Sequence, residues 1–148
     1  SSIQLVGIWN IFEMLNEDTI DTMVRTARNA RNNAYGPYSE TMTGACVLAS
    51  DGTLYGGCNV ENSSLGLSMC AERVAIFKAV SDGKQEFDGL AVIGDTEEPY
   101  IPCGACLQVI REFNIPELVL ANLEGDIRVV NIEEISSFFT YMGTNPIR

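Results

Sequence analysis

Two short stretches decide the fold of this chain: Cys70-Ala71-Glu72-Arg73 and Pro102-Cys103-Gly104-Ala105-Cys106. Cys103 and Cys106 are three residues apart, so in the first turn of a helix both thiols can point at one atom. Cys70 is expected at the start of another helix and can bring a third thiol to the same place. Three thiolates that leave one coordination position open are typical of a catalytic zinc site. The two stretches therefore predict one Zn²⁺ per chain.

An acid–base group is expected beside this metal, because metal-assisted hydrolysis also has to move protons. The chain contains no histidine, which excludes an imidazole base, a histidine ligand and a Ser-His-Asp triad. Glu72 lies two positions after Cys70, and we expect it to carry protons between water and substrate. In a regular helix Glu72 would face away from Cys70, so this role requires Cys70 to lie at an irregular helix end.

The charge of three thiolates on Zn²⁺ is net negative, which weakens the acidification of a bound water molecule. Two helix N-termini directed at the metal would partly offset this charge, at roughly 0.3–1 kcal/mol for each nearby charge. Arg73 is expected to add hydrogen bonds to thiolate sulfur and to tune the site in the same direction.

A second polar pair precedes the first cysteine stretch, in Gly57-Cys58-Asn59-Val60-Glu61-Asn62. Asn59 and Glu61 are two positions apart at the end of an expected strand, so their side chains share a face. An amide donor and a carboxylate acceptor together suit a sugar hydroxyl. A buried carboxylate built for a hydroxyl discriminates strongly against ligands that lack it. The pair therefore suits a ligand with a sugar hydroxyl, although Asn59 and Glu61 can also be ordinary polar residues at a strand end.

Apolar spacing and turn residues divide most of the chain into strands and helices. The expected helices begin at Glu17 and end before Gly36, cover 69–82 and 103–113, and include a short one after Asn131. The expected strands cover 44–49, 53–60, 90–93, 118–121 and 127–130. Asn16, Ser68 and Asn131 are the expected helix caps. This order predicts a three-layer α/β/α domain around a mixed five-stranded sheet, over residues 16–148.

The first 15 residues form an apolar extension. Leu5, Ile8, Trp9, Phe12 and Leu15 fall at helical spacing, which predicts a short amphipathic helix on the domain or on a partner subunit. The apolar run is too short to span a bilayer, and it lacks the basic start and cleavage site of a signal peptide. We therefore expect no membrane association.

The net charge and the number of cysteines limit which partners and which cell compartment are expected for this protein. The net charge of −11 repels nucleic acid polymers, and no run of Lys or Arg makes a basic patch. Five cysteines, an odd number without a secretory signal, indicate reduced thiols in a cytoplasmic protein.

Other interpretations of the cysteines remain open at this level. A Cys-x-x-Cys pair alone can be a redox dithiol. It can also be half of a structural zinc site that Cys70 and either Cys46 or Cys58 complete. The combination of the cysteines with Glu72 and the Asn59/Glu61 pair favours a catalytic metal.

Taken together, the two cysteine stretches resemble the short, all-cysteine cytidine deaminases. The resemblance runs from about Ala34-Tyr35-Gly36-Pro37-Tyr38-Ser39 through Gly125. It implies a cytidine-deaminase-like fold and a zinc hydrolase of pyrimidine salvage. Such an enzyme converts cytidine and deoxycytidine into uridine and deoxyuridine plus ammonia. It also implies a homo-oligomer, since these proteins usually form homotetramers.

The same resemblance implies roles for individual residues. Asn59 and Glu61 correspond to positions that hold the ribose 3′-hydroxyl. Backbone groups near Ala71 and the carbonyl of Ile101 correspond to positions that contact the base. Phe138, in the tail, corresponds to a residue that closes the pocket.

Three positions depart from the family pattern. Ile101 stands where the family usually has Ser, Leu107 where it usually has Arg, and Thr41 where a Phe often packs on the nucleoside. The changes at Thr41 and Leu107 motivate an alternative function, the deamination of a modified cytosine nucleoside such as blasticidin S.

Overall fold

Six strands form one mixed sheet in the computed structural model, which describes residues 2–6 and 15–136. The strands are β1 (Ser2–Val6), β2 (Thr43–Ala49), β3 (Leu54–Cys58), β4 (Phe87–Gly94), β5 (Glu117–Asn122) and β6 (Asp126–Asn131). The helices are α1 (Glu17–Arg31), α2 (Ala71–Ser81), α3 (Gly104–Glu112) and α4 (Ile132–Ser136), with a 3₁₀ turn, η1 (Leu65–Leu67). In the described part of the chain, no helix is long and apolar enough to cross a membrane.

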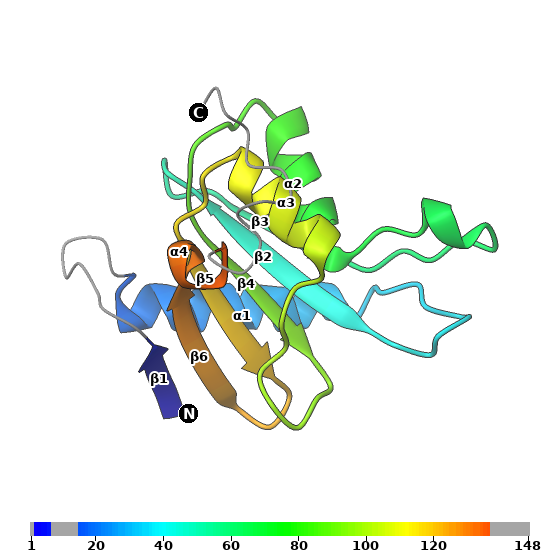
Figure 1. The fold of residues 1–148 in the computed structure, drawn as a ribbon, viewed down its shortest axis with the longest axis horizontal. Coiled ribbons are helices and arrows are strands. Elements are labelled where there is room, and N and C mark those ends of the chain that lie inside the picture. Colours follow the sequence, from blue (N-terminus) through cyan, green and yellow to red (C-terminus); the bar gives the residue numbers. More distant parts are fainter. Residues whose placement is uncertain (1, 7–14, 137–148) are drawn as a thin grey trace.

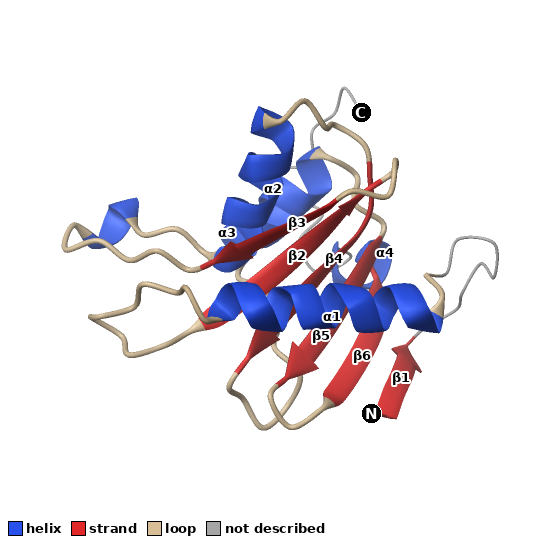
Figure 2. Ribbon diagram, turned by 180° about the vertical axis from the view of Figure 1, so that it is seen from behind, coloured by secondary structure: helices blue, strands red, loops and turns tan. Residues whose placement is uncertain are grey.

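The order of strands across the sheet is β1-β6-β5-β4-β2-β3 (Figure 1). β1 runs parallel to β6 and β4 runs parallel to β5, while the other neighbours are antiparallel. Helix α1 crosses one face of the sheet, and α2 and α3 lie on the other (Figure 2). The predicted three-layer architecture is confirmed.

Helix α1 begins where the sequence predicts. The side chain of Asn16 accepts a hydrogen bond from the backbone N–H of Thr19 at 2.8 Å, which satisfies one of the unpaired donors of the first turn. The stripe that faces the sheet consists of Ile20, Met23, Val24 and Ala27, all buried. This amphipathic stripe is what holds α1 on its face of the sheet.

Strand β2 lies in the middle of the molecule, and all seven of its residues are buried. Because side chains alternate along a strand, Ala45 and Val47 pack into the core under α2 and α3, while Cys46 and Leu48 pack under α1. A strand covered on both faces is apolar at nearly every position.

Gly57 allows α2 to approach the edge strand β3 closely. A Cβ added at Gly57 would lie 2.5 Å from the backbone N of Ala75 and 2.7 Å from the carbonyl O of Ala71. Any larger residue would push back the first turn of α2. This contact fixes where α2 begins relative to the sheet, and the candidate site lies at that end of α2.

The start of α2 corrects one prediction. Ser68 does not cap this helix, because its hydroxyl accepts from the backbone N–H of Asn62 at 3.0 Å. Met69 exchanges two backbone hydrogen bonds with Val60, so it is not free to enter a helix. Cys70 is the N-cap residue, with extended backbone angles of φ −75° and ψ 153°.

The N-terminal extension corrects a second prediction, the helix expected in the first 15 residues. Ser2–Val6 forms strand β1, which pairs with Asp126–Val130 of β6, so the predicted helix is wrong for these five residues. Pairing satisfies the backbone groups along an otherwise unpaired edge of β6. The sheet consequently has six strands, of which β2 to β6 are the five predicted ones. The remainder of the predicted helix, residues 7–14, lies outside the described residues.

Candidate active site

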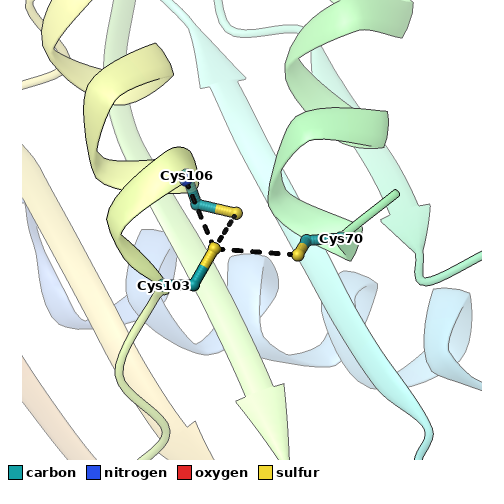
Figure 3. A group of neighbouring side chains, drawn as sticks. All are labelled: Cys70, Cys103 and Cys106. Atoms are coloured by element: carbon teal, nitrogen blue, oxygen red, sulfur yellow. Dashed lines mark hydrogen bonds between the residues drawn. The ribbon is translucent and has the colours of Figure 1, made fainter. Parts of the chain in front are cut away.

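Three cysteine thiols meet at the N-terminal ends of two neighbouring helices (Figure 3). Cys70 is the N-cap of α2, Cys103 is the N-cap of α3, and Cys106 lies in the first turn of α3. The Sγ atoms of Cys70 and Cys103 are 3.8 Å apart, those of Cys103 and Cys106 are 3.4 Å apart, and all three lie within 4.8 Å of one another. The structure thus brings together the three predicted ligands.

Neighbouring donors favour thiolates at this position. The backbone N–H of Cys106 donates to Cys103 Sγ at 3.4 Å, and Nη2 of Arg73 donates to Cys70 Sγ at 3.3 Å. Hydrogen bonding, first from Cys106 and then from Arg73, lowers the pKa of Cys70 to about 5 despite its partial burial. The same hydrogen bond raises the pKa of Cys106, because Cys70 ionises first and its thiolate accepts the hydrogen bond that Cys106 donates. Arg73 is the predicted tuning residue, and it lies in contact with the cluster.

The donor set fits zinc. Sulfur ligands at about tetrahedral spacing suit Zn²⁺, and helix N-termini offset their charge. Within residues 2–6 and 15–136, the group of potential ligands around this point consists of these three cysteines. Cys46 is buried on the α1 face of β2, and Cys58 lies on β3 opposite Gly44 of β2. Neither belongs to the group of potential ligands, so neither completes a four-sulfur structural site. Cys70, Cys103 and Cys106 can therefore hold the metal ion with a position left for another ligand.

Glu72 is completely buried in the first turn of α2, next to the thiols. Among the described residues, neither of its carboxyl oxygens has a hydrogen-bond partner of normal geometry. Burial raises the pKa of Glu72 to about 7, so it can both take up and release a proton near neutral pH. A buried carboxyl group that no described residue uses for structure is a candidate for chemistry at the site. The irregular helix end that this role requires is present, because Cys70 has extended backbone angles.

Asn59 and Glu61 hold the loop at residues 38–43 by hydrogen bonds. Oδ1 of Asn59 accepts from the N–H of Thr43 at 2.8 Å, and its Nδ2 donates to the carbonyl of Thr41 at 2.9 Å. Oε1 of Glu61 accepts from the N–H groups of Tyr38 and Ser39 at 3.0 and 3.1 Å, and its Oε2 accepts from the Ser39 hydroxyl. These bonds to Ser39 lower the pKa of Glu61, which keeps it ionised.

The other residues named from the sequence lie in different settings. Ala71 is buried as the first residue of α2, while Ile101 is 61% exposed in the segment before Cys103. Leu107 is buried in the core between the sheet and α3, so an apolar residue suits this position of the helix. Thr41 is exposed in the loop that Asn59 and Glu61 hold. Phe138 lies outside the described residues.

Tyr100 is a residue that sequence reasoning missed. Its ring packs against Gly94, and its backbone N–H donates to the carbonyl of Ala121 at 3.2 Å. Burial raises the pKa of Tyr100 to about 12, with a further contribution from the negative charge of Glu72. A lone tyrosine in a loop carries no spacing signal, so only the folded chain shows that it lies near the site.

Comparison with known proteins agrees with this geometry. Residues 17–122 match a family model described as the cytidine and deoxycytidylate deaminase zinc-binding region. The chain is 49% identical over 119 residues to a cytidine deaminase of Sporosarcina psychrophila, a match that covers 78% of this chain and 87% of the relative. It is 44% identical over 115 residues to a cytidine deaminase of Halalkalibacterium halodurans, covering 76% of this chain and 87% of the relative.

A solved structure gives the same result in three dimensions. The fold superposes on the crystal structure of a cytidine deaminase from Burkholderia pseudomallei with a TM-score of 0.76 and 42% sequence identity. That match covers 82% of this chain and 96% of the other. With all three thiols of the cluster inside the matched region, the chain belongs to the zinc-binding cytidine and deoxycytidylate deaminase family.

Proposed function

We propose that this protein is an enzyme of pyrimidine salvage that removes the amino group of cytidine and deoxycytidine by hydrolysis. The products are uridine and deoxyuridine plus ammonia. The observation that carries the proposal is the buried Glu72 carboxyl group, without a partner among the described residues, beside three thiols that can hold zinc. A buried acid with a pKa of about 7 beside a metal site is equipped for hydrolysis.

Zinc held by Cys70, Cys103 and Cys106 would supply a Lewis acid that makes water acidic enough to act as a nucleophile near pH 7. Glu72 takes the proton that the attacking water loses and passes it to the ring nitrogen of the base. Glu72 then takes the second proton, from the hydroxyl group now bonded to the ring carbon, and gives it to the amino group. The bond from the ring carbon to the amino group breaks, the oxygen becomes the carbonyl of the product, and the amine departs as ammonia. A carbon–oxygen bond replaces the carbon–nitrogen bond, and Glu72 ends in its starting protonation state.

Substrate binding uses groups on either side of this acid. The N–H at the start of α2, near Ala71, and the carbonyl of Ile101 hold the base in the proposed arrangement. Asn59 and Glu61 hold the sugar 3′-hydroxyl. Both keep hydrogen-bonding capacity for this role. Nδ2 of Asn59 has a second hydrogen, and among the described residues Oε2 of Glu61 accepts from Ser39 alone. Because their bonds also hold the loop at residues 38–43, the sugar site is formed before the substrate arrives.

A substrate panel tests this assignment. We expect cytidine and deoxycytidine to be deaminated at rates within about tenfold of each other, because no proposed contact involves the 2′-hydroxyl. We expect 3′-deoxycytidine to react with kcat/KM lower by on the order of tenfold, because Asn59 and Glu61 would each lose a hydrogen bond to the 3′-hydroxyl. The loss of ultraviolet absorbance of the cytosine ring measures each rate. Zinc-loaded protein that turns over neither natural nucleoside would overturn the proposal.

The two other functions are less well supported. Blasticidin S belongs in the same panel, but the relatives at 49% and 44% identity carry the name cytidine deaminase, so a modified cytosine is not favoured. A structural zinc site or a redox dithiol accounts for the thiols and leaves the buried Glu72 carboxyl group without a role.

The protein is further proposed to act as a homo-oligomer, a tetramer by resemblance to the short all-cysteine members of the family. Leu65 and Leu67 of η1 are 74% and 68% exposed, and Tyr38 on the neighbouring loop is 54% exposed. Figure 1 shows both loops projecting from the same end of the molecule. Exposed apolar residues on two loops that project from the same end of the molecule favour a protein contact surface there. Sedimentation velocity should show a tetramer, and a monomer at micromolar concentration would contradict this assignment.

The partner and compartment follow from the same chemistry. The net charge of −11 disfavours a polynucleotide, so the substrate is a free nucleoside. All five cysteines are unpaired, and thiols that bind zinc must stay reduced, which suits the cytoplasm. Subcellular fractionation tests the compartment.

A further inference from the structure

The segment from residue 95 to 102 carries one proposed functional group, the Ile101 carbonyl, leads directly into Cys103, and has no helix or strand of its own. It leaves β4 after Gly94 and ends at the ligand Cys103, with the carbonyl of Ile101 just before it. Its outer side is open, as Ile101 is exposed and the ion pair of Glu98 with Arg128, at 3.7 Å, is on the surface. Such a segment needs anchors if its end is to stay in one place.

The anchors that the structure provides lie at the end of β5. The N–H of Tyr100 donates to the carbonyl of Ala121, and the Tyr100 ring covers Gly94 so closely that an added Cβ would lie 2.6 Å from its Cδ2. Nδ2 of Asn122 donates to the carbonyl of Glu97 at 2.9 Å. Asn122 lies directly opposite Gly94 in the parallel pairing of β4 and β5, at the point where the segment leaves the sheet.

Asn122 is completely buried, and its side chain serves two structures at once. Its Oδ1 accepts from the N–H groups of Glu124 and Asp126 at 3.1 and 3.0 Å, and its Nδ2 donates to Asp126 Oδ2 at 2.9 Å. These three bonds build the turn between β5 and β6. The bond to the carbonyl of Glu97 belongs to the segment and is not needed for the turn.

We propose that Asn122 is a positioning residue for the active site: through the Glu97 carbonyl it holds residues 95–102, and with them the Ile101 carbonyl and Cys103. Residues that orient a metal ligand typically change metal affinity or activity by about 10- to 100-fold when they are lost. The part of this inference that concerns the base contact rests on the proposed function, whereas the part that concerns Cys103 rests on the geometry alone.

An exchange of two side chains tests the bond to the segment. Asp126→Asn alone keeps every bond of Asn122, because the introduced amide oxygen can accept in place of the carboxylate. The double variant Asn122→Asp/Asp126→Asn keeps the turn, since the carboxylate at 122 accepts from both N–H groups and the amide at 126 donates back to it. The donor to the Glu97 carbonyl is lost, and a carboxylate oxygen that repels this carbonyl takes its place. The double variant therefore differs from its matched control in the contact with the Glu97 carbonyl and in the charge of the buried side chain at position 122.

Two measurements test the effect of losing this bond: the rate of zinc release and the KM for cytidine. The zinc-loaded proteins are mixed with the chromogenic chelator 4-(2-pyridylazo)resorcinol, and we expect the double variant to release zinc about tenfold faster than Asp126→Asn. We also expect its KM for cytidine to rise by about three- to tenfold, with kcat reduced by less, because the base contact is lost to ground state and transition state alike. The melting temperature of the double variant should fall only modestly, because the buried carboxylate at 122 keeps the two N–H donors of Glu124 and residue 126.

Equal zinc release and equal KM in the two variants would overturn the proposal. A rise in zinc release in a protein without cytidine turnover would refute the proposed function and leave the positioning of Cys103 supported. Faster release accompanied by a large fall in melting temperature would show a disrupted turn, and the proposal would then be wrong as stated.

Discussion

Replacing Glu72 with Gln should lower kcat for cytidine by about 10²–10⁴-fold. The amide has nearly the same size and fills the same buried position, but it cannot accept and release a proton. Because Glu72 is not one of the cluster of potential ligands, the variant should keep about one zinc per chain. Turnover followed by ultraviolet absorbance and metal content by plasma emission test both parts of this result.

Glu117 offers a matched control for this experiment. It is also a fully buried glutamate, but it lies at the start of β5, where its Oε2 accepts from the N–H of Leu15 at 3.1 Å. It pairs across the sheet with Gly89, at the end of β4 remote from the site. Glu117→Gln should leave kcat of the folded protein within about threefold of the wild type. A Glu72→Gln variant as active as this control would remove the assigned role.

Replacing Cys106 with Ser should abolish zinc binding and turnover together. Cys106 is the completely buried member of the cluster, and a hydroxyl group at this position does not ionise to replace the thiolate. We expect the zinc content to fall from about one per chain to near zero, and kcat to fall by at least about 10²-fold. Metal analysis of the purified variant, before any assay, gives the first of these values.

Cys46 separates loss of the metal from damage to the core. Its side chain is as buried as that of Cys106, and burial raises the pKa of its thiol to about 12, so it stays neutral. Cys46→Ser places the same hydroxyl in the core on the α1 face of the sheet. It should lower stability and still retain about one zinc per chain. Zinc loss in both variants would show that the cluster fails through unfolding and not through the missing ligand.

The site could be predicted from the sequence to the extent that it depends on spacing. Cys103 and Cys106 are one helical turn apart in any helix that begins at Cys103, so their convergence needs no knowledge of the fold. The position of Cys70 relative to these two cysteines cannot be predicted from spacing in the same way. It is separated from Cys103 by 33 residues, and the 3.8 Å between their sulfur atoms depends on the packing of α2 and α3 against the same face of the sheet.

Where predictions were wrong, long-range pairing outweighed local preference. Ser68 is a favourable cap, but Met69 pairs with Val60 and delays the helix until Cys70. Apolar spacing in the first 15 residues indicates a helix, but Ser2–Val6 pairs with the open edge of β6. In both cases backbone groups from a distant part of the chain provide hydrogen bonds that a local pattern does not reveal.

By itself, the sequence of this protein identified the three cysteines that meet in one cluster, the glutamate beside them and strands β2 to β6. These depend on residue type and on spacing within one element, which a chain carries wherever it folds. Only the tertiary structure decided that Glu72 is buried without a partner among the described residues, that Asn59 and Glu61 hold a loop, and that Asn122 holds the segment before Cys103. Burial and contacts between distant residues arise when helices and strands pack, and no local pattern encodes them.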